Sequence, residues 1–217
     1  MTRKAIEKKY GFENPFKPDP LSRKAIQRIP GGGSLLDVGC GEGADSVFFA
    51  KKGFSVTSLD VNNEYVGRLR KYCKDEKLGN VAVHRRNISS FSYPRNRYDV
   101  IISLLAICCV RRNEAHNILR GIRQAVKPGG IVVLSARNYL DPEMKECCCA
   151  GKMVERNTFR REEDCCKYVY FVEKGLLREA FRGFQILHYH EGYGPCKYGE
   201  HSKHGDTNII CRRRRGK

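Results

Sequence analysis

Short apolar runs alternate with amphipathic segments over the first two thirds of the chain. Each apolar run has about four to eight residues, the length typical of a strand buried on both faces. Several of the segments between them end at glycine, as helices commonly do. Strands that alternate with helices at this spacing predict a parallel sheet covered by helices on both faces. The expected strands are Ser34–Val38, Phe54–Leu59, Val81–His84, Tyr98–Leu105 and Ile131–Ser135, and the expected helices are Ala44–Lys52, Glu64–Lys77 and Asn113–Val126.

The C-terminal third of the chain departs from this alternation after Ala136. A helix is predicted over Phe171–Phe181, and two strands over Phe184–His190 and Thr207–Arg212. The connection Glu191–Asp206 is too short for a helical crossover, so these two strands should pair antiparallel. Together the segments predict an α/β protein with a Rossmann-like seven-stranded mostly parallel sheet, helices on both faces and an antiparallel last strand.

A chain of 217 residues and 24.8 kDa has the size of one domain. We therefore predict a single domain over residues 1–217. Residues 1–30 are basic and interrupted by prolines, and the short helical stretches Lys4–Lys9 and Leu21–Arg28 predict a cover over one end of the core. The polar, weakly periodic stretch Asn138–Lys167 predicts an insertion, and we interpret 138–170 as a cysteine-rich lid over the rim of the site.

The chain shows no signal for a membrane. No apolar run approaches the roughly 20 residues that a membrane-spanning helix needs, and the longest, Val100–Val110, is interrupted by Ser103. The basic residues at the start are followed by no apolar segment, so they do not form a signal peptide. We expect a cytoplasmic protein without a membrane partner.

The chain has 11 cysteines, several of them adjacent, as in Cys147–Cys149. Adjacent cysteines rarely bond to each other, and none of the adjacent sets has the C-x-x-C spacing of a zinc site. We favour reduced thiols in a cytosolic protein, and we predict no metal site. A thiol-rich lid that handles a soft substrate or metal is the alternative.

The net charge of +17 attracts anions of every size. The basic residues are spread along the chain, and only Arg212–Arg215 forms a solid block, at the C-terminal end. Nucleic-acid-binding proteins often carry aromatic residues that stack on bases beside stripes of basic residues, and no such pattern is evident here. We expect a small anionic or soft nucleophilic substrate and a monomer or homodimer, with nucleic acid possible but not favoured.

The most informative stretch is a strand that runs directly into a glycine loop, Asp37-Val-Gly39-Cys-Gly41-Glu-Gly43. Glycines let the backbone turn sharply and approach a ligand, and Asp60 after the next strand can accept both hydroxyls of a ribose. A pyrophosphate beside Asp37 would be a like-charge contact, whereas a cofactor with an ammonium and a sulfonium would be favoured there. The loop therefore predicts S-adenosylmethionine as the cofactor, over a dinucleotide.

These motifs resemble those of class I S-adenosylmethionine-dependent methyltransferases, over most of the chain. The resemblance implies that Asp37 and the loop hold the methionine end, that Asp60 holds the ribose and that Val61 flanks the adenine. It places Asn87 where the family commonly has an aspartate against the adenine amino group. The cofactor-binding residues implied are Asp37, Gly39, Cys40, Gly41, Gly43, Ser46, Asp60, Val61, Asn62, Asn87, Ile88, Ser103 and Leu104.

A finer resemblance is to the tellurite-resistance-type methyltransferases. It rests on Gly53-Phe54-x-Val56-Thr57-x-x-Asp60-x-Asn62, and on the C-terminal Glu191-x-x-Gly194 followed by His201 and His204-Gly205. The family usually has Arg-Asn where this chain has Ala44-Asp45. The resemblance implies methyl transfer to a small nucleophile, such as a metalloid oxyanion or a thiol.

Candidates for the reaction side lie mostly near the C-terminus. His188 and His190 share one face of a predicted strand, because side chains alternate with period two. The predicted catalytic residues are Tyr10, His188, His190 and His201, and Glu191 and His204 are further candidates. His201 and His204 could instead bind a metal together with Cys196. Methylation of RNA or another macromolecule, and a non-catalytic S-adenosylmethionine-binding regulator, are the alternative functions.

Overall fold

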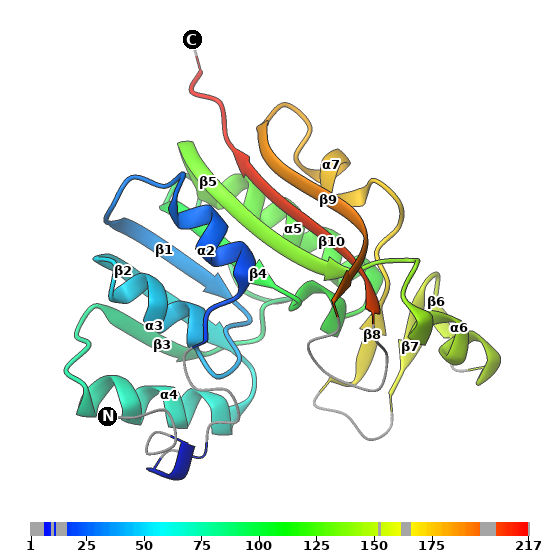
Figure 1. Ribbon diagram of the computed structural model, residues 1–217, viewed down its shortest axis with the longest axis horizontal. Coiled ribbons are helices and arrows are strands. Elements are labelled where there is room, and N and C mark those ends of the chain that lie inside the picture. The colour runs from blue at the N-terminus through cyan, green and yellow to red at the C-terminus, as the bar shows by residue number, and fades with distance from the viewer. Residues whose placement is uncertain are drawn as a thin grey trace.

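The computed structural model describes residues 7–9, 11, 17–151, 153–161, 166–195 and 203–216 (Figure 1). A seven-stranded sheet runs through its centre, with the strand order β3-β2-β1-β4-β5-β10-β9. The first five strands are parallel, and β10 is antiparallel to both of its neighbours. These strands are β1 (Gly33–Val38), β2 (Phe54–Asp60), β3 (Val81–Arg85), β4 (Tyr98–Leu104), β5 (Val126–Arg137), β9 (Gln185–Pro195) and β10 (Lys203–Arg212). The sequence prediction of the fold class is confirmed, including the antiparallel last strand.

Helices cover both faces of this sheet, as its apolar strands require. On one face lie α2 (Pro20–Ile26), α3 (Ala44–Ala50) and α4 (Asn63–Asp75) (Figure 1). On the other lie α5 (Arg112–Ala125) and α7 (Leu176–Ala180). Neighbouring strand residues point to opposite faces, so Leu35 packs with the α2–α3 cluster and Leu36 with the α5–α7 cluster.

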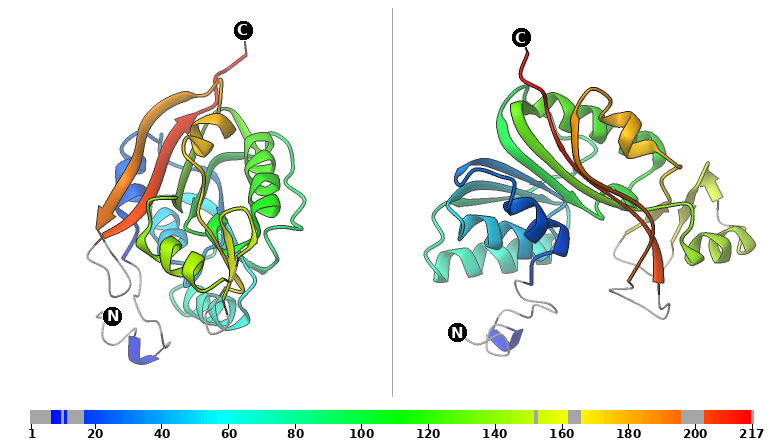
Figure 2. Two further views of the ribbon diagram at one scale, coloured as in Figure 1. Left: turned by 90° about the vertical axis from the view of Figure 1, so that its right-hand side faces the viewer. Right: turned by 45° about the horizontal axis from the view of Figure 1, so that its top comes forward.

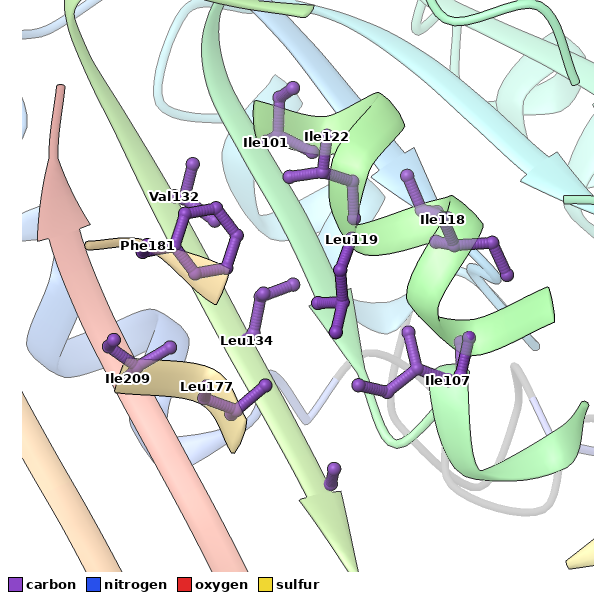
Figure 3. Close-up of a cluster of buried hydrophobic side chains, with 14 of the residues drawn as sticks. Ile101, Ile107, Ile118, Leu119, Ile122, Val132, Leu134, Leu177, Phe181 and Ile209 are labelled. Atoms are coloured by element: carbon purple, nitrogen blue, oxygen red, sulfur yellow. The ribbon is translucent and has the colours of Figure 1, made fainter. Parts of the chain in front are cut away.

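The larger core cluster joins the sheet to α5 and α7 (Figure 3). Leu119 from α5 and Phe181 after α7 meet strand residues such as Val132 and Leu134, all of them buried. Burial of a large apolar side chain contributes about 1.5–3 kcal/mol of hydrophobic free energy. This cluster packs against β4 and β5, whose carboxyl ends contribute to the walls of the two cavities described below.

Residues 138–170 contain regular structure that the sequence pattern did not reveal. A short helix, α6 (Pro142–Cys149), is followed by a three-stranded sheet of β6 (Met153–Glu155), β7 (Thr158–Arg160) and β8 (Tyr168–Tyr170). Figure 2 shows this unit beside the carboxyl end of β5. It packs through a small cluster of Phe159, Val169 and Phe171, and it adjoins the short 3-10 helix η1 (Ile107–Cys109) that follows β4.

The predicted helix over Phe171–Phe181 is wrong in its first half. Tyr170, Phe171 and Val172 are all fully buried, and Val172 forms a parallel bridge with Asn138. The apolar run that suggested a helix is therefore an extended segment buried on both sides. The helix α7 begins only after Gly175, which has a left-handed φ of 73°.

The last two strands are longer than predicted. The sequence placed Glu191–Asp206 in a loop, but β9 continues to Pro195 and β10 begins at Lys203. His204 pairs with Gly194, and Asp206 with Gly192, so the two strands remain paired through part of the predicted loop. Likewise β5 begins at Val126, with a register shift opposite Asp99, whereas the sequence placed Val126 at the end of a helix and began this strand at Ile131.

Candidate functional site

The glycine loop after β1 has a backbone that only glycine adopts readily. Gly39, Gly41 and Gly43 have φ values of 75°, 52° and 83°. A Cβ on Gly39 would lie 2.3 Å from the Cβ of Ala106, which follows β4. The loop thus lies against the exit of β4 so closely that a side chain would not fit.

Asp60, at the end of β2, fixes this loop through its carboxylate. Its Oδ2 accepts a hydrogen bond of 2.8 Å from the Gly41 backbone N–H, and its Oδ1 accepts one of 2.8 Å from the Asn62 N–H. Asn62 in turn caps α4 by accepting from the Glu64 N–H at 2.9 Å. A carboxylate has about four lone-pair positions, so Asp60 can accept further hydrogen bonds from a ligand.

A cavity of about 500 Å³, the loop cavity, opens at the carboxyl ends of β1, β2, β3 and β4. This is the place where open α/β sheets bind their ligands. The Oγ of Ser89 in its wall is buried and has no hydrogen-bond partner among the described residues. The sequence-predicted cofactor residues that line the cavity are Gly39, Gly41, Asp60, Val61, Asn62, Asn87, Ile88 and Leu104.

The other predicted cofactor residues lie behind the loop or beside it, and within the described chain they are not part of the cavity wall. They are Asp37, Cys40, Gly43, Ser46 and Ser103. Ser103 is fully buried and donates a hydrogen bond of 3.1 Å to the Val38 carbonyl, which ties β4 to β1. Cys40 lies in the loop, and burial next to Asp37 and Asp60 raises the pKa of its thiol.

Asp37 belongs to a buried polar cluster beneath the loop. Its carboxyl accepts a hydrogen bond of 2.6 Å from the Ser46 hydroxyl, and Ser46 lies 2.7 Å from the hydroxyl of Ser58 on β2. Burial, followed by the charges of Asp45 and Asp60, raises the pKa of Asp37 to about 8. The cluster therefore holds a carboxyl group that is neutral at pH 7 unless a positive charge approaches.

Replacement of Asp37 by asparagine should change how stability depends on pH. Between the ordinary value of 3.8 and about 8, the folded protein keeps a proton that the unfolded chain has released. The wild-type free energy of unfolding should therefore fall as pH rises through this window. Urea titrations from about pH 5 to about pH 8 should show Asp37→Asn gaining stability relative to wild type. Parallel curves for the two proteins would contradict the raised pKa, and Asp75→Asn, at the surface, serves as the control.

A second cavity, of about 290 Å³, lies on the other side of Leu105 and is called the histidine cavity here. Leu105 lines both cavities and has an unusual left-handed φ of 59°. Its N–H lies 3.0 Å from the Ser135 carbonyl oxygen and 3.1 Å from the Ser135 hydroxyl, and these contacts hold it there. Such strained residues cluster at ligand sites. The histidine cavity is lined by Asp19, Pro20, Leu21, Lys24, Leu105, Ser135, Arg137, His188, His204, Gly205, Asp206 and Asn208.

The two predicted catalytic histidines on β9, His188 and His190, lie in different surroundings. His188 lines the histidine cavity, where its Nδ1 lies 3.3 Å from the Lys24 ammonium. Burial and the charge of Lys24 lower the pKa of His188. His190 pairs instead with Asp206, at 3.3 Å between Nε2 and Oδ1.

Apart from His204, which lines the histidine cavity, the remaining candidates for the reaction side are not placed in either cavity by the described residues. Glu191 accepts hydrogen bonds from the Gly175 N–H at 2.8 Å and from the Tyr189 hydroxyl at 3.0 Å, so it supports the start of α7. Tyr10 and His201 lie outside the described residues.

Sequence reasoning did not select the basic residues of the histidine cavity. Arg137 is the last residue of β5, so the rule that ligands lie beyond the carboxyl ends of parallel strands could have found it. Lys24 comes from α2, which is far from β9 in the sequence, so no local pattern indicated that Lys24 and His188 lie together. Cys166, Lys167 and Tyr168, in the stretch interpreted as a lid, also line the loop cavity, but none of them was selected as a site residue.

Three further features of the described residues bear on the sequence predictions: the cysteines, the absence of a metal cluster and the absence of a membrane-spanning helix. The described cysteines all carry free thiols, and Cys109 and Cys166 line the loop cavity. No three acidic, histidine or cysteine side chains of the described residues are placed to hold a metal ion. Within the same ranges, no helix has the length and apolar character needed to cross a membrane.

Comparison with known sequences agrees with this arrangement. Residues 35–130 match the family model of the methyltransferase domain. The chain is 28% identical over 161 residues to the probable S-adenosyl-L-methionine-dependent methyltransferase TehB of Haemophilus influenzae, covering 74% of this chain and 49% of TehB. It is 31% identical over 137 residues to the ubiquinone biosynthesis O-methyltransferase of Serratia proteamaculans, covering 59% of this chain and 56% of that protein. The chain spans about half the length of these curated relatives.

Solved structures share the fold over almost the whole chain. TehB from Haemophilus influenzae superposes with a TM-score of 0.73 at 19% identity, over 96% of this chain and 66% of TehB. The 1,6-didemethyltoxoflavin-N1-methyltransferase of Burkholderia thailandensis, solved with 1,6-didemethyltoxoflavin and S-adenosylhomocysteine, gives 0.63 at 16% identity, over 90% of this chain and 77% of that one. Residues 35–130 are therefore similar to the methyltransferase domain, and the chain has the Rossmann-like methyltransferase fold seen in TehB.

Proposed function

We propose that this protein is an S-adenosylmethionine-dependent methyltransferase that acts on a small nucleophilic acceptor, of the thiol or metalloid-oxyanion class. The observation that carries the proposal is the pair of cavities that meet at Leu105. One is built on a glycine loop and a strand-end carboxylate, and the other is lined by basic and imidazole side chains. A methyl donor in the loop cavity would thus face an acceptor in the histidine cavity.

The residues of the loop cavity fit the proposed cofactor. Its charged wall residues are Asp60, Glu114 and Lys167, so acidic groups predominate locally in a chain of net charge +17. Such a wall favours a cofactor that carries positive charge and disfavours a pyrophosphate. The unpartnered Ser89 hydroxyl and the exposed Asn87 amide offer polar groups to an adenine.

The family resemblance supports the following roles for individual residues. The Gly39–Gly43 backbone would hold the methionine end, with Asp37 and Ser46 behind it. Asp60 and Asn62 would hold the ribose. Val61, Asn87 and Ile88 would enclose the adenine, and Leu104 would lie next to the transferred methyl group, with the buried Ser103 behind it. The cover 1–30 and the lid 138–170 would shield the two cavities from water.

When bound, S-adenosylmethionine supplies an electrophilic methyl group on a sulfonium. The protein's own contribution is to align the acceptor with that group and to exclude water, which is where most of the rate acceleration of such displacements arises. Lys24 and His188 form a donor pair that can hold an anionic acceptor. The acids of the same cavity are engaged, since Asp19 caps α2 at 2.8 Å and Asp206 accepts from Asn208 at 3.1 Å.

A small acceptor is favoured over RNA by the position of the arginine block. Arg212 is the last residue of β10, which runs antiparallel to β5, so the block lies towards the amino end of β5 (Figure 1). Both cavities, by contrast, are lined by residues at the carboxyl ends of the parallel strands. Arg213 donates hydrogen bonds to the Val126 carbonyl and to Asn96. The strongest basic cluster is thus at the end of the sheet remote from the proposed methyl group.

Calorimetry can test the donor site. At about pH 7 Asp37 is neutral, and a positively charged ligand in the loop cavity would favour its ionised form. Binding of S-adenosylmethionine should then release a proton, so that the measured enthalpy depends on the ionisation enthalpy of the buffer. Asp37→Asn should remove this dependence and still bind. Absence of binding by wild-type protein would refute the proposed function.

Transfer of labelled methyl groups then tests the acceptor. Wild-type protein with labelled S-adenosylmethionine should label 2-mercaptobenzoate, 3-mercaptopropionate or tellurite in preference to RNA. Labelling of RNA alone, with a binding affinity that falls steeply with salt, would favour the macromolecular alternative. Binding of the donor without any transfer would favour a regulator.

A further inference from the structure

A third cavity is built where β10 ends, towards the amino end of β5 and thus away from the two cavities already described. It has a volume of about 540 Å³ and is called the arginine cavity here. Its wall consists of Pro30, Gly129, Gln185 and Arg212–Arg215. Four of these wall residues are arginines and none is acidic, and a cleft lined by one sign of charge concentrates counter-ions.

The backbone that carries the arginine block is held against the sheet. Arg212 pairs with β5 on one side and with β9 on the other. The Arg213 N–H donates a hydrogen bond of 2.9 Å to the Gly130 carbonyl, and the Arg213 carbonyl accepts one of 2.8 Å from the Gly129 N–H. The block is therefore fixed in the fold at least as far as Arg213, and its side chains have defined starting points.

The first two guanidinium groups are anchored by uncharged oxygens. Arg212 donates a hydrogen bond of 3.0 Å to the Arg28 carbonyl. Arg213 donates one of 2.6 Å to the Val126 carbonyl and one of 2.8 Å to the Asn96 amide oxygen. These partners position the two side chains without neutralising them, and a guanidinium with five N–H groups keeps further donors for a ligand.

The other two arginines, Arg214 and Arg215, are exposed. A Cβ on Gly129 would lie 3.0 Å from Nε of Arg215, so this side chain lies along the turn at the cavity wall. Asp99 on the nearby strand β4 is occupied, because Lys127 contacts both of its oxygens at 2.9 Å. Within the described parts of the chain, no carboxylate pairs with any of the four arginines, and their charge is left for a ligand.

The chemistry of the wall indicates the kind of anion. The planar guanidinium fork matches the oxygens of a phosphate group and can bind them in pairs. The cavity is as large as the loop cavity, which has about 500 Å³, so it has room for more than one phosphate group. Its wall contains no aromatic ring on which a base could stack, which disfavours single-stranded nucleic acid.

We propose that the arginine cavity binds a chain of phosphate groups, either free or carried by a nucleotide. Arg214 and Arg215 contact the phosphate oxygens, while the anchored Arg212 and Arg213 supply fixed positive charge beside them. The site lies away from the proposed donor and acceptor cavities and is independent of methyl transfer. Its failure would leave the proposed function unchanged.

Calorimetry of the full chain with inorganic triphosphate, at about 0.15 M salt, tests this site. The double variant Arg214→Gln/Arg215→Gln should bind triphosphate about tenfold more weakly or worse, because charge-assisted hydrogen bonds are lost. Its urea midpoint and its affinity for S-adenosylmethionine should stay those of wild type. Undiminished triphosphate binding by this variant overturns the proposal.

Two matched variants separate a built site from attraction by the net charge of +17. Lys145→Gln/Arg160→Gln removes two exposed charges from the lid 138–170, beside the carboxyl end of β5, and should bind triphosphate nearly as wild type does (Figure 1). Arg214→Lys/Arg215→Lys keeps the charge but loses the fork, and should recover only part of the affinity. Equal weakening by the lid variant, or full recovery with lysine, contradicts a phosphate site built from arginine.

The source of the phosphate chain is tested with two further probes. ATP should bind at least as tightly as inorganic triphosphate, and with the same sensitivity to Arg214→Gln/Arg215→Gln. Tighter binding of ATP would identify a nucleotide as the source of the phosphate chain. An oligouridylate that binds more tightly than either, and loses its affinity in the same variant, would overturn the proposal in favour of a nucleic-acid surface.

Discussion

Replacement of Asp60 by alanine should weaken S-adenosylmethionine binding by about 2–4 kcal/mol, or roughly 30- to 700-fold in the dissociation constant. The substitution would remove the carboxylate and with it the proposed hydrogen bonds to the ribose. It would also release the Gly41 and Asn62 N–H groups, each now held at 2.8 Å, so the loop and the start of α4 would lose their common anchor. Isothermal titration calorimetry measures the change.

Two further variants separate these contributions. Asp60→Asn keeps one acceptor oxygen and no charge, and its affinity should lie between those of wild type and alanine. Asp75→Ala removes an aspartate that pairs with Lys9 at the surface, and it should bind as wild type does. Equal affinities for all four proteins would show that Asp60 does not bind the cofactor.

Replacement of Gly39 by alanine should cost about 2–5 kcal/mol of stability and disrupt cofactor binding. The left-handed φ of 75° disfavours any side chain, and the new Cβ would overlap the Cβ of Ala106 at 2.3 Å. Because Gly39 and Ala106 both line the loop cavity, any relaxation would deform it. Urea denaturation and calorimetry measure the two effects.

The chain offers a matched control and a rescue for this variant. Gly41→Ala also places a side chain at positive φ, but nothing lies within 4 Å of its Cβ, so it should cost only about 1–2 kcal/mol. Ala106→Gly in the Gly39→Ala protein removes the opposing Cβ and should recover part of the stability. If Gly39→Ala and Gly41→Ala were equally destabilised, the close packing of the loop on the exit of β4 would be wrong.

The arrangement of the sheet could be predicted because its signals are local. The runs at Ser34–Val38 and Phe54–Leu59 are bounded by glycine or by a charged residue at the strand end, and a right-handed crossover leaves few ways to connect them. The loop with Asp60 follows from the same rule, because parallel strands bring their carboxyl ends to one edge. The helix predicted over Phe171–Phe181 failed because an extended segment buried on both sides has no alternating pattern to distinguish it from a helix.

The sequence by itself determined the arrangement of the sheet and the position of the glycine loop. It also predicted that the cofactor carries a positive charge. Only the tertiary structure decided that Asp37 lies beneath the loop as a raised-pKa carboxyl, and that Lys24, Arg137, His188 and His204 meet in one cavity. The physical reason is distance along the chain. Hydrophobic periodicity and turn residues act over a few positions, whereas the contacts of Lys24 with His188 and of Asp141 with His204 span 164 and 63 positions and arise only when the packed sheet brings those segments together.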